Sequence, residues 1–346
     1  SSFGSSLHTL GAASARGGKW MFGFDEQPTD DGDADRLRLW AIYYVVICCS
    51  LSTQVVSILG LALVTAKSCY RCCHRRQQAH RVQEPIALIV PCYLPNEAEI
   101  IIETLEHLLT QLELVDALDI YLVYNTPHDM PVEEAELHAL AAAQQTEGRR
   151  LFVQHVHGSM SKAENLNHII PQITANFIAI YDADHHPDPQ SLSLAIACLE
   201  DRGVDCVQGS TYIREGKCLP RTMVHAEFFV TYFVLLPMME AIAGNGLFGG
   251  ANAVWRSSSL QQLRFNEKML TEDIDCFARA VLDHNFSFAF LPECRSGELL
   301  PANCKSFWAQ RSRWAMGWDQ VTVRYGASFF SANLPLRRRI GLYYIF

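Results

Sequence analysis

The sequence predicts an α/β fold, with a mainly parallel sheet, helices on both of its faces, and flanking transmembrane and interfacial helices. Between residues 85 and 300, short apolar runs typical of buried strands alternate with helical patterns. Strands that are separated by helices pair in parallel, and the helices then cover both faces of one sheet. A long run without charged residues precedes this region and predicts a membrane element.

The uncharged run covers residues 39–66, where no Asp, Glu, Lys or Arg occurs. At about 1.5 Å per residue, a helix of this length exceeds the roughly 30 Å hydrocarbon core, so residues 37–67 are predicted to form a transmembrane helix. A basic juxtamembrane linker follows at residues 68–84 and places the later residues in the cytosol. We expect residues 336–346 to be the truncated start of a second transmembrane helix. The prediction is a multi-pass integral membrane protein, with the plasma membrane as its location and residues 85–300 as its cytosolic domain.

The overall charge argues against one class of partner. The chain has 346 residues, with 28 Lys and Arg against 37 Asp and Glu, and a net charge of −9. Nucleic-acid binders need a basic face that neutralises phosphates, so we expect no nucleic-acid partner and a lipid bilayer instead. Residues 1–36 are rich in Gly, Ser and Asp and are predicted to be a mobile tail.

The 12 cysteines are scattered without a pairing rhythm, which predicts reduced thiols on the cytosolic side of the membrane. Cys69, Cys72 and Cys73 directly follow the predicted transmembrane helix. Three interpretations stay open for them: plain thiols, lipidation, or a metal site that includes His74.

The strand candidates are short, apolar segments bounded by turn residues. They are residues 86–90, 119–124, 151–156, 177–181, 204–208, 249–254 and 286–291. Helical patterns separate the first four, for example residues 96–112, where Leu105 and Leu109 can share one face. The sequence contains no internal repeat and no glycine-rich phosphate loop, which argues against kinase-like and Rossmann dehydrogenase folds.

Two carboxylates follow the strand candidate at residues 177–181. Asp182 and Asp184 would therefore lie at the carboxyl end of a buried strand, where open α/β sheets bind their ligands. Carboxylates one residue apart can hold one hard divalent cation, Mg²⁺ or Mn²⁺, together with the phosphates of a nucleotide. Capping of the following helix is the structural alternative. His185 and His186 could add a metal ligand, or they could simply be solvated or hydrogen-bonded.

Two further motifs follow in order, Thr271-Glu272-Asp273 and Gln310-Arg311-Ser312-Arg313-Trp314. With Asp182-Ala183-Asp184, they resemble the D-x-D, T-E-D and Q-x-x-R-W signature of the inverting family 2 glycosyltransferases. The processive membrane branch of that family contains the cellulose, chitin and hyaluronan synthases. The resemblance covers residues 85–320. It implies a GT-A-type, nucleotide-sugar-binding catalytic domain at residues 85–300 and an interfacial amphipathic helix region at residues 301–335 that carries Q-x-x-R-W.

The resemblance implies that Asp273 is the catalytic base, which takes the proton from the acceptor hydroxyl. The structural alternative is the first turn of a helix, where acidic residues favour the positive end of the dipole, and both can hold. Contact with the acceptor sugar is implied for Glu272, Gly250, Gln310 and Trp314. Arg313 would meet the diphosphate, whereas Arg311 could contact either a phosphate or a lipid headgroup.

Other positions match residues that hold the nucleotide in the family. The implied nucleotide contacts are Tyr93, Glu97, Asn125, Lys162, Asp182 and Arg313, and the implied metal ligands are Asp184 and Asp182. Asn125 stands where many family members have an Asp that reads uracil. Glu164 replaces a usual Gly after Lys162.

These observations predict a processive enzyme that transfers glucose from UDP-glucose to a growing β-glucan, with inversion. The expected partners are a UDP-sugar donor, a polysaccharide acceptor, the bilayer, and a homo-oligomer or synthase complex. Three alternatives stay open: single transfer to a lipid acceptor, a hyaluronan- or chitin-type synthase using UDP-GlcNAc, and a catalytically silent scaffold subunit. The apolar residues 228–239 are too short to span, so they would pack under the membrane, line the polymer path or join the core.

Overall fold

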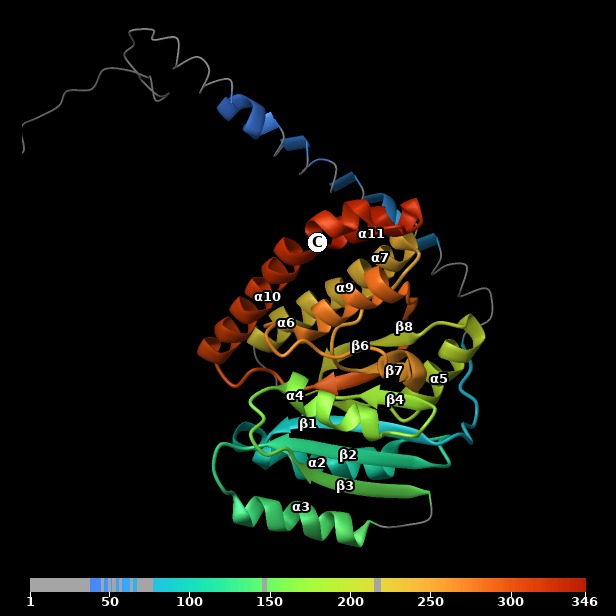
Figure 1. Ribbon diagram of the computed structural model, residues 1–346, viewed down its shortest axis with the longest axis vertical. Helices are drawn as coiled ribbons and strands as arrows, with labels where there is room; N and C mark the ends of the chain where they lie inside the picture. The colour runs from blue at the N-terminus through green and yellow to red at the C-terminus, as the bar shows by residue number, and fades with distance from the viewer. Residues whose placement is uncertain are drawn as a thin grey trace, which may run out of the picture. The chain divides into compact units, whose positions relative to one another are not determined.

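The computed structural model describes residues 38–346 except 45–46, 49–50, 52–53, 56–57, 63–64, 67–76, 145–147 and 215–218 (Figure 1). The described residues divide into two units, one ending at Ser52 and one running from Thr53 to Phe346. The predictions for residues 1–36 and for Cys69, Cys72 and Cys73 lie outside the described residues. Every described residue between 38 and 66 is helical. The transmembrane role of residues 37–67 stays a prediction.

One open sheet organises the larger unit, and eight strands belong to it in the described part of the chain. Their spatial order is β3-β2-β1-β4-β7-β6-β8-β5. The strands are β1 Ile86–Tyr93, β2 Leu118–Asn125, β3 Arg149–His155, β4 Phe177–Ile180, β5 His186–Pro187, β6 Cys206–Ile213, β7 Ala253–Arg256 and β8 Phe288–Glu298. All of them except the two-residue strand β5 overlap a predicted strand.

Six of the eight strands described run in the same direction, so the sheet is mainly parallel, as predicted, but two antiparallel strands make it mixed. β1 pairs in parallel with β2 and β4, β2 with β3, and β6 with β8. β7, however, pairs antiparallel with both β4 and β6, and β5 pairs antiparallel with β8. An apolar run indicates that a strand is buried but does not indicate its direction, so the sequence pattern missed these antiparallel strands.

Helices cover both faces of the sheet, as predicted. They are α2 Leu94–Gln111, α3 Pro131–Ala143, α4 Lys162–Ile169, α5 Ser191–Arg202, α6 Leu219–Val230, α7 Leu236–Ala243, α8 Ser257–Leu260, α9 Glu272–His284, α10 Cys304–Ser331 and α11 Leu336–Ile345, with a 3₁₀ turn at Ile170–Gln172 and a π-helical segment, η2, at Thr231–Leu235. Alternate residues of β1 point to opposite faces. Leu88 and Val90 join a core under α2, α3 and α5, whereas Ala87 and Ile89 join a core under α4 and α9.

α6, η2 and α7 follow one another without a break, so the apolar residues 228–239 belong to a longer helix. Within the described residues, Arg221–Ala243 is the one helix whose length and composition would allow it to cross a bilayer. α11 packs against α7 so closely that a Cβ added to Gly341 would lie 2.0 Å from Ala243 Cβ. Figure 1 shows α6, α7, α9, α10 and α11 gathered at the opposite end of this unit from α3.

Candidate functional site

A cleft of about 650 Å³ opens at the carboxyl ends of β1, β2 and β4, a size in the usual range for ligand pockets. Parallel strands end at the same edge of a sheet, and this explains why residues far apart in the sequence meet there. The predicted site residues that line this cleft are Tyr93, Glu97, Asn125, Lys162, Asp182, Asp184, Glu272, Asp273, Gln310, Arg313 and Trp314. Gly250 is the one predicted site residue that does not line the cleft, although its neighbour Gly249 does.

The carboxylates of the D-x-D motif have defined partners. Asp182 Oδ1 forms an ion pair with Lys162 Nζ. Burial disfavours the charged carboxylate, but Lys162 and His185 outweigh burial and lower the pKa of Asp182 below its usual value. Asp184 Oδ2 accepts a hydrogen bond from the backbone N of Leu299 at 3.1 Å. The capping alternative is wrong, because the next helix, α5, begins only at Ser191 and has no side-chain cap.

The donor set of Asp182 and Asp184 fits Mg²⁺ or Mn²⁺ when a nucleotide diphosphate completes it. Both side chains offer carboxylate oxygens to the cleft, and hard cations prefer oxygen ligands from one or two carboxylates plus phosphates. The structure brings no group of three or more His, Cys, Asp or Glu together as a metal site within the described ranges. A protein-only cage is therefore absent from that part of the chain, and phosphate oxygens would have to supply the remaining ligands.

Asp273 lies in the first turn of α9, and its Oδ1 accepts a hydrogen bond from Ile274 N at 2.9 Å. Burial, reinforced by Glu272 and opposed by Lys162, raises the pKa of Asp273 to about 7. Gly250 has φ +89°, and a Cβ there would lie 2.5 Å from Asp273 Oδ2. A carboxyl group with a pKa near neutrality is well matched to general base work, because it takes up a proton readily and can still be ionised.

The raised pKa of Asp273 predicts a pH dependence. The base must be deprotonated, so kcat/KM should be constant above about pH 7 and should fall roughly tenfold per pH unit below it. Initial rates at several pH values, with the donor concentration well below its KM, measure this pH dependence of kcat/KM.

Burial also raises the pKa of Glu97 to about 7, so the Glu97→Gln variant is the necessary control. The fall in kcat/KM at low pH should persist in that variant, because the resemblance places Glu97 at the nucleotide and not at the acceptor. The assignment to Asp273 would be contradicted if kcat/KM no longer fell at low pH in Glu97→Gln. It would also be contradicted if kcat/KM of the wild type began to fall only below pH 5.

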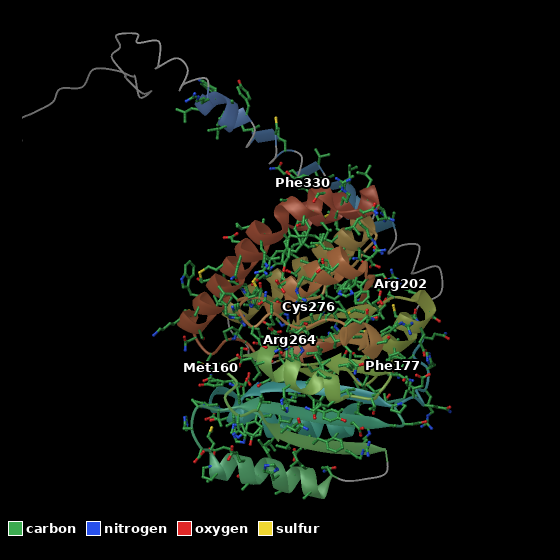
Figure 2. The ribbon with its side chains drawn as sticks, in the orientation of Figure 1. Met160, Phe177, Arg202, Arg264, Cys276 and Phe330 are labelled. Atoms are coloured by element: carbon green, nitrogen blue, oxygen red, sulfur yellow. The ribbon has the colours of Figure 1, made fainter. Side chains whose placement is uncertain are left out.

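Lys162 is the first residue of α4, and Ser161 caps this helix by accepting from Glu164 N at 3.2 Å. Glu164, which replaces the family's usual Gly, accepts a hydrogen bond from Met160 N and so binds the loop before α4 to the first turn of that helix. Met160, labelled in Figure 2, lies on this loop at the edge of the cleft. Burial disfavours the ammonium of Lys162, but Asp182 and Glu272 outweigh it and raise its pKa, so Lys162 brings a positive charge into the cleft.

Asn125, at the end of β2, is held by a hydrogen-bond network. Its Oδ1 accepts from Asn165 Nδ2 at 2.8 Å, and its Nδ2 donates to Ser159 O at 3.1 Å. At the end of β1, Glu97 Oε2 accepts from Tyr93 N at 2.7 Å. The end of the cleft where the resemblance places the nucleotide is therefore built from polar groups held in place at the ends of β1 and β2 and at the start of α2.

α10 carries the Q-x-x-R-W residues, and a capping box between Asn303 and Ser306 starts it. Gln310, Arg313 and Trp314 line the cleft. Arg313 Nη1 donates to Leu270 O at 3.2 Å, so this guanidinium contacts the segment before the T-E-D motif.

Arg311 is not among the residues that line the cleft. Its guanidinium lies 4.1 Å from the centre of the Trp314 ring and forms a 3.0 Å ion pair with Glu227 of α6. Neither a phosphate nor a lipid headgroup is needed to account for Arg311, because it supports Trp314 and joins α10 to α6.

Glu298 was not predicted, yet it lines the cleft at the end of β8. Its carboxylate lies 3.4 Å from His185 Nε2, and His185 Nδ1 lies 2.9 Å from Ser296 Oγ. Both ring nitrogens of His185 are thus engaged within the protein, which removes it as a metal ligand. His186 lies 3.2 Å from Thr104 Oγ1 and stacks on His107, away from the two aspartates. No local signal marks Glu298, because it reaches the cleft only through the pairing of β8 with β6.

The open mixed sheet, with carboxylates and basic side chains converging on one cleft, is consistent with the GT-A glycosyltransferase fold. Residues 177–346, just under half of the chain, match the family model described as "Glycosyl transferase family group 2". The predicted cellulose, chitin and hyaluronan synthase branch is not distinguished by this match and stays a prediction.

Two curated relatives illustrate the similarity. The chain is 27% identical over 171 residues to "Probable glucomannan 4-beta-mannosyltransferase 3" of Arabidopsis thaliana, which covers 47% of this chain and 30% of the relative. It is 23% identical over 270 residues to "Probable glycosyltransferase YdaM" of Bacillus subtilis (strain 168), covering 75% of this chain and 61% of the relative. The chain thus spans about a third of the plant relative's length and less than two thirds of the bacterial one's.

A solved structure agrees on the fold. "Mannosyltransferase PcManGT from Pyrobaculum calidifontis in complex with GDP-Man and Mn2+" superimposes with a TM-score of 0.58 at 18% identity, covering 85% of this chain and 81% of that one. At this identity, the similarity extends to the fold alone.

Proposed function

We propose that this protein is a metal-dependent, inverting hexosyltransferase that extends a β-linked polysaccharide from a nucleoside diphosphate sugar. One observation carries the proposal: Asp273, the Lys162–Asp182 pair and Trp314 line a single cleft. A base, a positive charge for phosphate and an aromatic face for a sugar are the three groups that such a transfer requires.

In the proposed reaction, an acceptor hydroxyl attacks the anomeric carbon of the donor from the side opposite the diphosphate. Asp273 takes the hydroxyl proton, the new C–O bond forms, and the bond to the diphosphate breaks with its electron pair leaving on the diphosphate oxygen. Attack from the opposite side inverts the configuration. The near-neutral pKa of Asp273 supports this assignment.

Lys162, Arg313 and the two aspartates would hold the diphosphate. Lys162 and Arg313 both offer positive charge to the cleft, and Arg313 can bind two phosphate oxygens at once. A Mg²⁺ or Mn²⁺ ion held by Asp182 and Asp184 would neutralise charge on the leaving diphosphate. Tyr93, Glu97 and Asn125 would contact the base and ribose at the other end.

Trp314 would support the acceptor sugar, together with Glu272, Gln310 and the Gly249–Gly250 loop. Because Arg311 packs on Trp314, the ring is held in place from within the protein. Processive extension needs such a fixed platform, since the chain end must be held between additions. The single-transfer alternative, with a lipid acceptor, needs no long sugar platform.

This platform leads to a prediction. Trp314→Ala should raise the acceptor KM by roughly tenfold, which corresponds to about 1.4 kcal/mol of lost binding. The product chains should also become shorter, because each intermediate dissociates sooner. Product length on a sizing column and the donor KM, which should not change, separate loss of the platform from general damage. Unchanged product length would contradict processive holding by Trp314.

Two donors have support. UDP-glucose follows from the resemblance to β-glucan synthases. GDP-mannose is the second candidate, because matched relatives are named as glucomannan mannosyltransferases and the bound donor in the structural neighbour is GDP-Man. Asn125 stands where many family members have an Asp that reads uracil, so this position does not favour UDP over another nucleotide. UDP-GlcNAc is the third donor to compare.

A bilayer partner is supported by apolar side chains that expose more than half of their surface. They gather on α6, α10 and α11: Met223, Phe229, Trp308, Met316, Val323, Phe330, Leu336, Ile340 and Tyr343. Exposed apolar patches of this kind mark contact surfaces. With the uncharged residues 39–66, they support contact with a membrane. Several spans, the plasma membrane as location and a cytosolic catalytic domain stay predictions. A homo-oligomer or a synthase complex stays a prediction.

The test measures nucleotide release by the protein in membranes, with Mg²⁺ or Mn²⁺ and with UDP-glucose, GDP-mannose and UDP-GlcNAc supplied separately. Release with one donor, accompanied by a large product that a linkage-specific glycosidase digests, is the expected result. Release only after a lipid acceptor is added would favour the single-transfer alternative. No release with any donor, despite nucleotide binding, would favour a silent scaffold subunit.

A further inference from the structure

Two side chains of α10 hold the segment that precedes Asp273: Gln320, which does not line the cleft, and Arg313, which does. Gln320 makes two hydrogen bonds to this segment's backbone. Its Oε1 accepts from Leu270 N at 3.1 Å, and its Nε2 donates to Lys268 O at 3.3 Å. Arg313, about two turns earlier on α10, donates to Leu270 O at 3.2 Å. The backbone just before the T-E-D motif is therefore bonded to α10 through both its N–H and its C=O groups.

The backbone of α10 also packs directly against this segment. A Cβ added to Gly317 would lie 2.4 Å from Thr271 Cγ2, and Thr271 is the residue at the N-cap of α9. Arg313, Gly317 and Gln320 recur at helical spacing and share one face of α10. That face is the one turned toward the start of α9.

A buried carboxylate joins the same two helices further along. Asp275, fully buried, follows Asp273 by two residues. Its Oδ1 accepts from Tyr325 of α10 at 2.8 Å, and its Oδ2 accepts from Arg279 Nε at 2.8 Å. Arg279 Nη2 also donates to the backbone O of Arg264 at 2.5 Å. Figure 2 labels Arg264 in the middle of the domain. A buried carboxylate is costly unless its partners are in place, so this network favours one arrangement of α9 against α10.

We propose that Gln320 and Tyr325 are positioning residues that hold the Asp273 carboxylate at a set distance from the acceptor platform formed by Trp314. The inference rests on the proposed function. Trp314 belongs to the same helix as Gln320 and Tyr325, so α10 links the base and the platform as one rigid element. Neither Gln320 nor Tyr325 lines the cleft, and neither would touch donor or acceptor.

The kinetic test uses Gln320→Ala and Tyr325→Phe in the full chain in membranes. A misplacement of about 1 Å costs up to about 100-fold in rate, so kcat should fall by roughly 10- to 100-fold. The donor KM and the Kd of the free nucleotide should stay within about threefold of the wild type, because the nucleotide end is built on β1 and β2. Gln320→Glu keeps the acceptor for Leu270 N but loses the donor to Lys268 O, and it should lie between Gln320→Ala and the wild type.

Matched controls remove the same groups elsewhere. Tyr343→Phe deletes a hydroxyl from an exposed tyrosine of α11, and Gln262→Ala deletes an amide that bonds only Ser258 O. Both should keep the wild-type kcat. A fall in kcat for Gln320→Ala and Tyr325→Phe that is matched by an equal loss of nucleotide affinity would indicate general unfolding and would overturn the positioning role.

Amide hydrogen exchange tests the contact without any turnover. The Leu270 amide is donated to Gln320, so its exchange should accelerate in Gln320→Ala while amides of β1 keep the wild-type rate. If the wild type transfers no sugar, the proposed function fails, and the exchange data still decide whether α10 holds this segment. Two results would overturn the inference. One is an unchanged exchange rate at the Leu270 amide in Gln320→Ala, and the other is a wild-type kcat in the variants when the wild type does transfer sugar.

Discussion

Replacement of Asp273 by asparagine is expected to lower kcat by about 10³-fold, within the range that loss of a general base produces. Asparagine has nearly the shape of aspartate, and its amide oxygen can still accept the 2.9 Å hydrogen bond from Ile274 N. The variant should therefore keep the first turn of α9 while losing the group that accepts the acceptor's proton. The initial rate of nucleotide release, with the donor that supports transfer in the wild type, measures the effect.

A second aspartate on the same helix provides the control. Asp283 is exposed near the far end of α9, and Asp283→Asn should keep the wild-type kcat. The Kd of the nucleotide should be the same in Asp273→Asn, Asp283→Asn and the wild type. If Asp273→Asn retained more than a tenth of the wild-type kcat, another carboxylate would have to be the base. Glu272 would be the first residue to test.

Replacement of Gly250 by alanine should lower kcat by about 100-fold, because the added methyl group displaces the base. A Cβ at this position would lie 2.5 Å from Asp273 Oδ2, closer than real Cβ contacts allow. The residue also has φ +89°, where an L side chain adds roughly 1–2 kcal/mol of strain. Either Asp273 or the Gly249–Gly250 loop must then shift, and both shifts alter the acceptor side of the cleft. Steady-state kinetics with separate donor and acceptor titrations measure kcat and both KM values.

Gly203→Ala separates strain from displacement. Gly203 also has positive φ, +60°, but no atom lies within 4 Å of an added Cβ, and it caps the far end of α5. This variant should lower the melting temperature by a few degrees and leave kcat unchanged. Equal losses of kcat in Gly203→Ala and Gly250→Ala would mean that backbone strain, not contact with Asp273, explains the effect.

The strands were predictable because each is a short apolar run with a local boundary. β1, for instance, is apolar on both sides, and its alternate residues lie in the two cores on opposite faces of the sheet. Such a pattern indicates a central strand with helices on both faces. The two-residue strand β5 has no comparable pattern, since it contributes only His186 and Pro187 to the edge of β8.

The candidate site was predictable where a motif follows a strand or starts a helix. Asp182 and Asp184 follow β4, and Asp273 lies in the first turn of α9. Asn125 ends β2 in the same way. The shared edge of parallel strands accounts for the meeting of Asn125, Asp182 and Asp184, whereas the place of Asp273 beside them was implied by the family resemblance.

Side-chain direction, by contrast, depended on neighbours that are distant in sequence. Arg311 contacts Glu227 across 84 positions of the chain, and Arg313 contacts Leu270 across 43. His185 is turned toward Ser296 and Glu298 by the pairing of β5 with β8. A motif gives a residue's position along its own element, but the partner of a charged side chain is chosen by the elements packed against it.

Local patterns were thus sufficient for the α/β class and the strands of the central sheet, because hydrophobic periodicity is a property of short segments. Most residues of the cleft were implied by the family resemblance. The antiparallel direction of β7, the place of Glu298 in the cleft and the attachment of α10 to the start of α9 were decided by tertiary packing. These features depend on contacts between segments far apart in the chain, and the free energy of such contacts has no counterpart in the local sequence pattern.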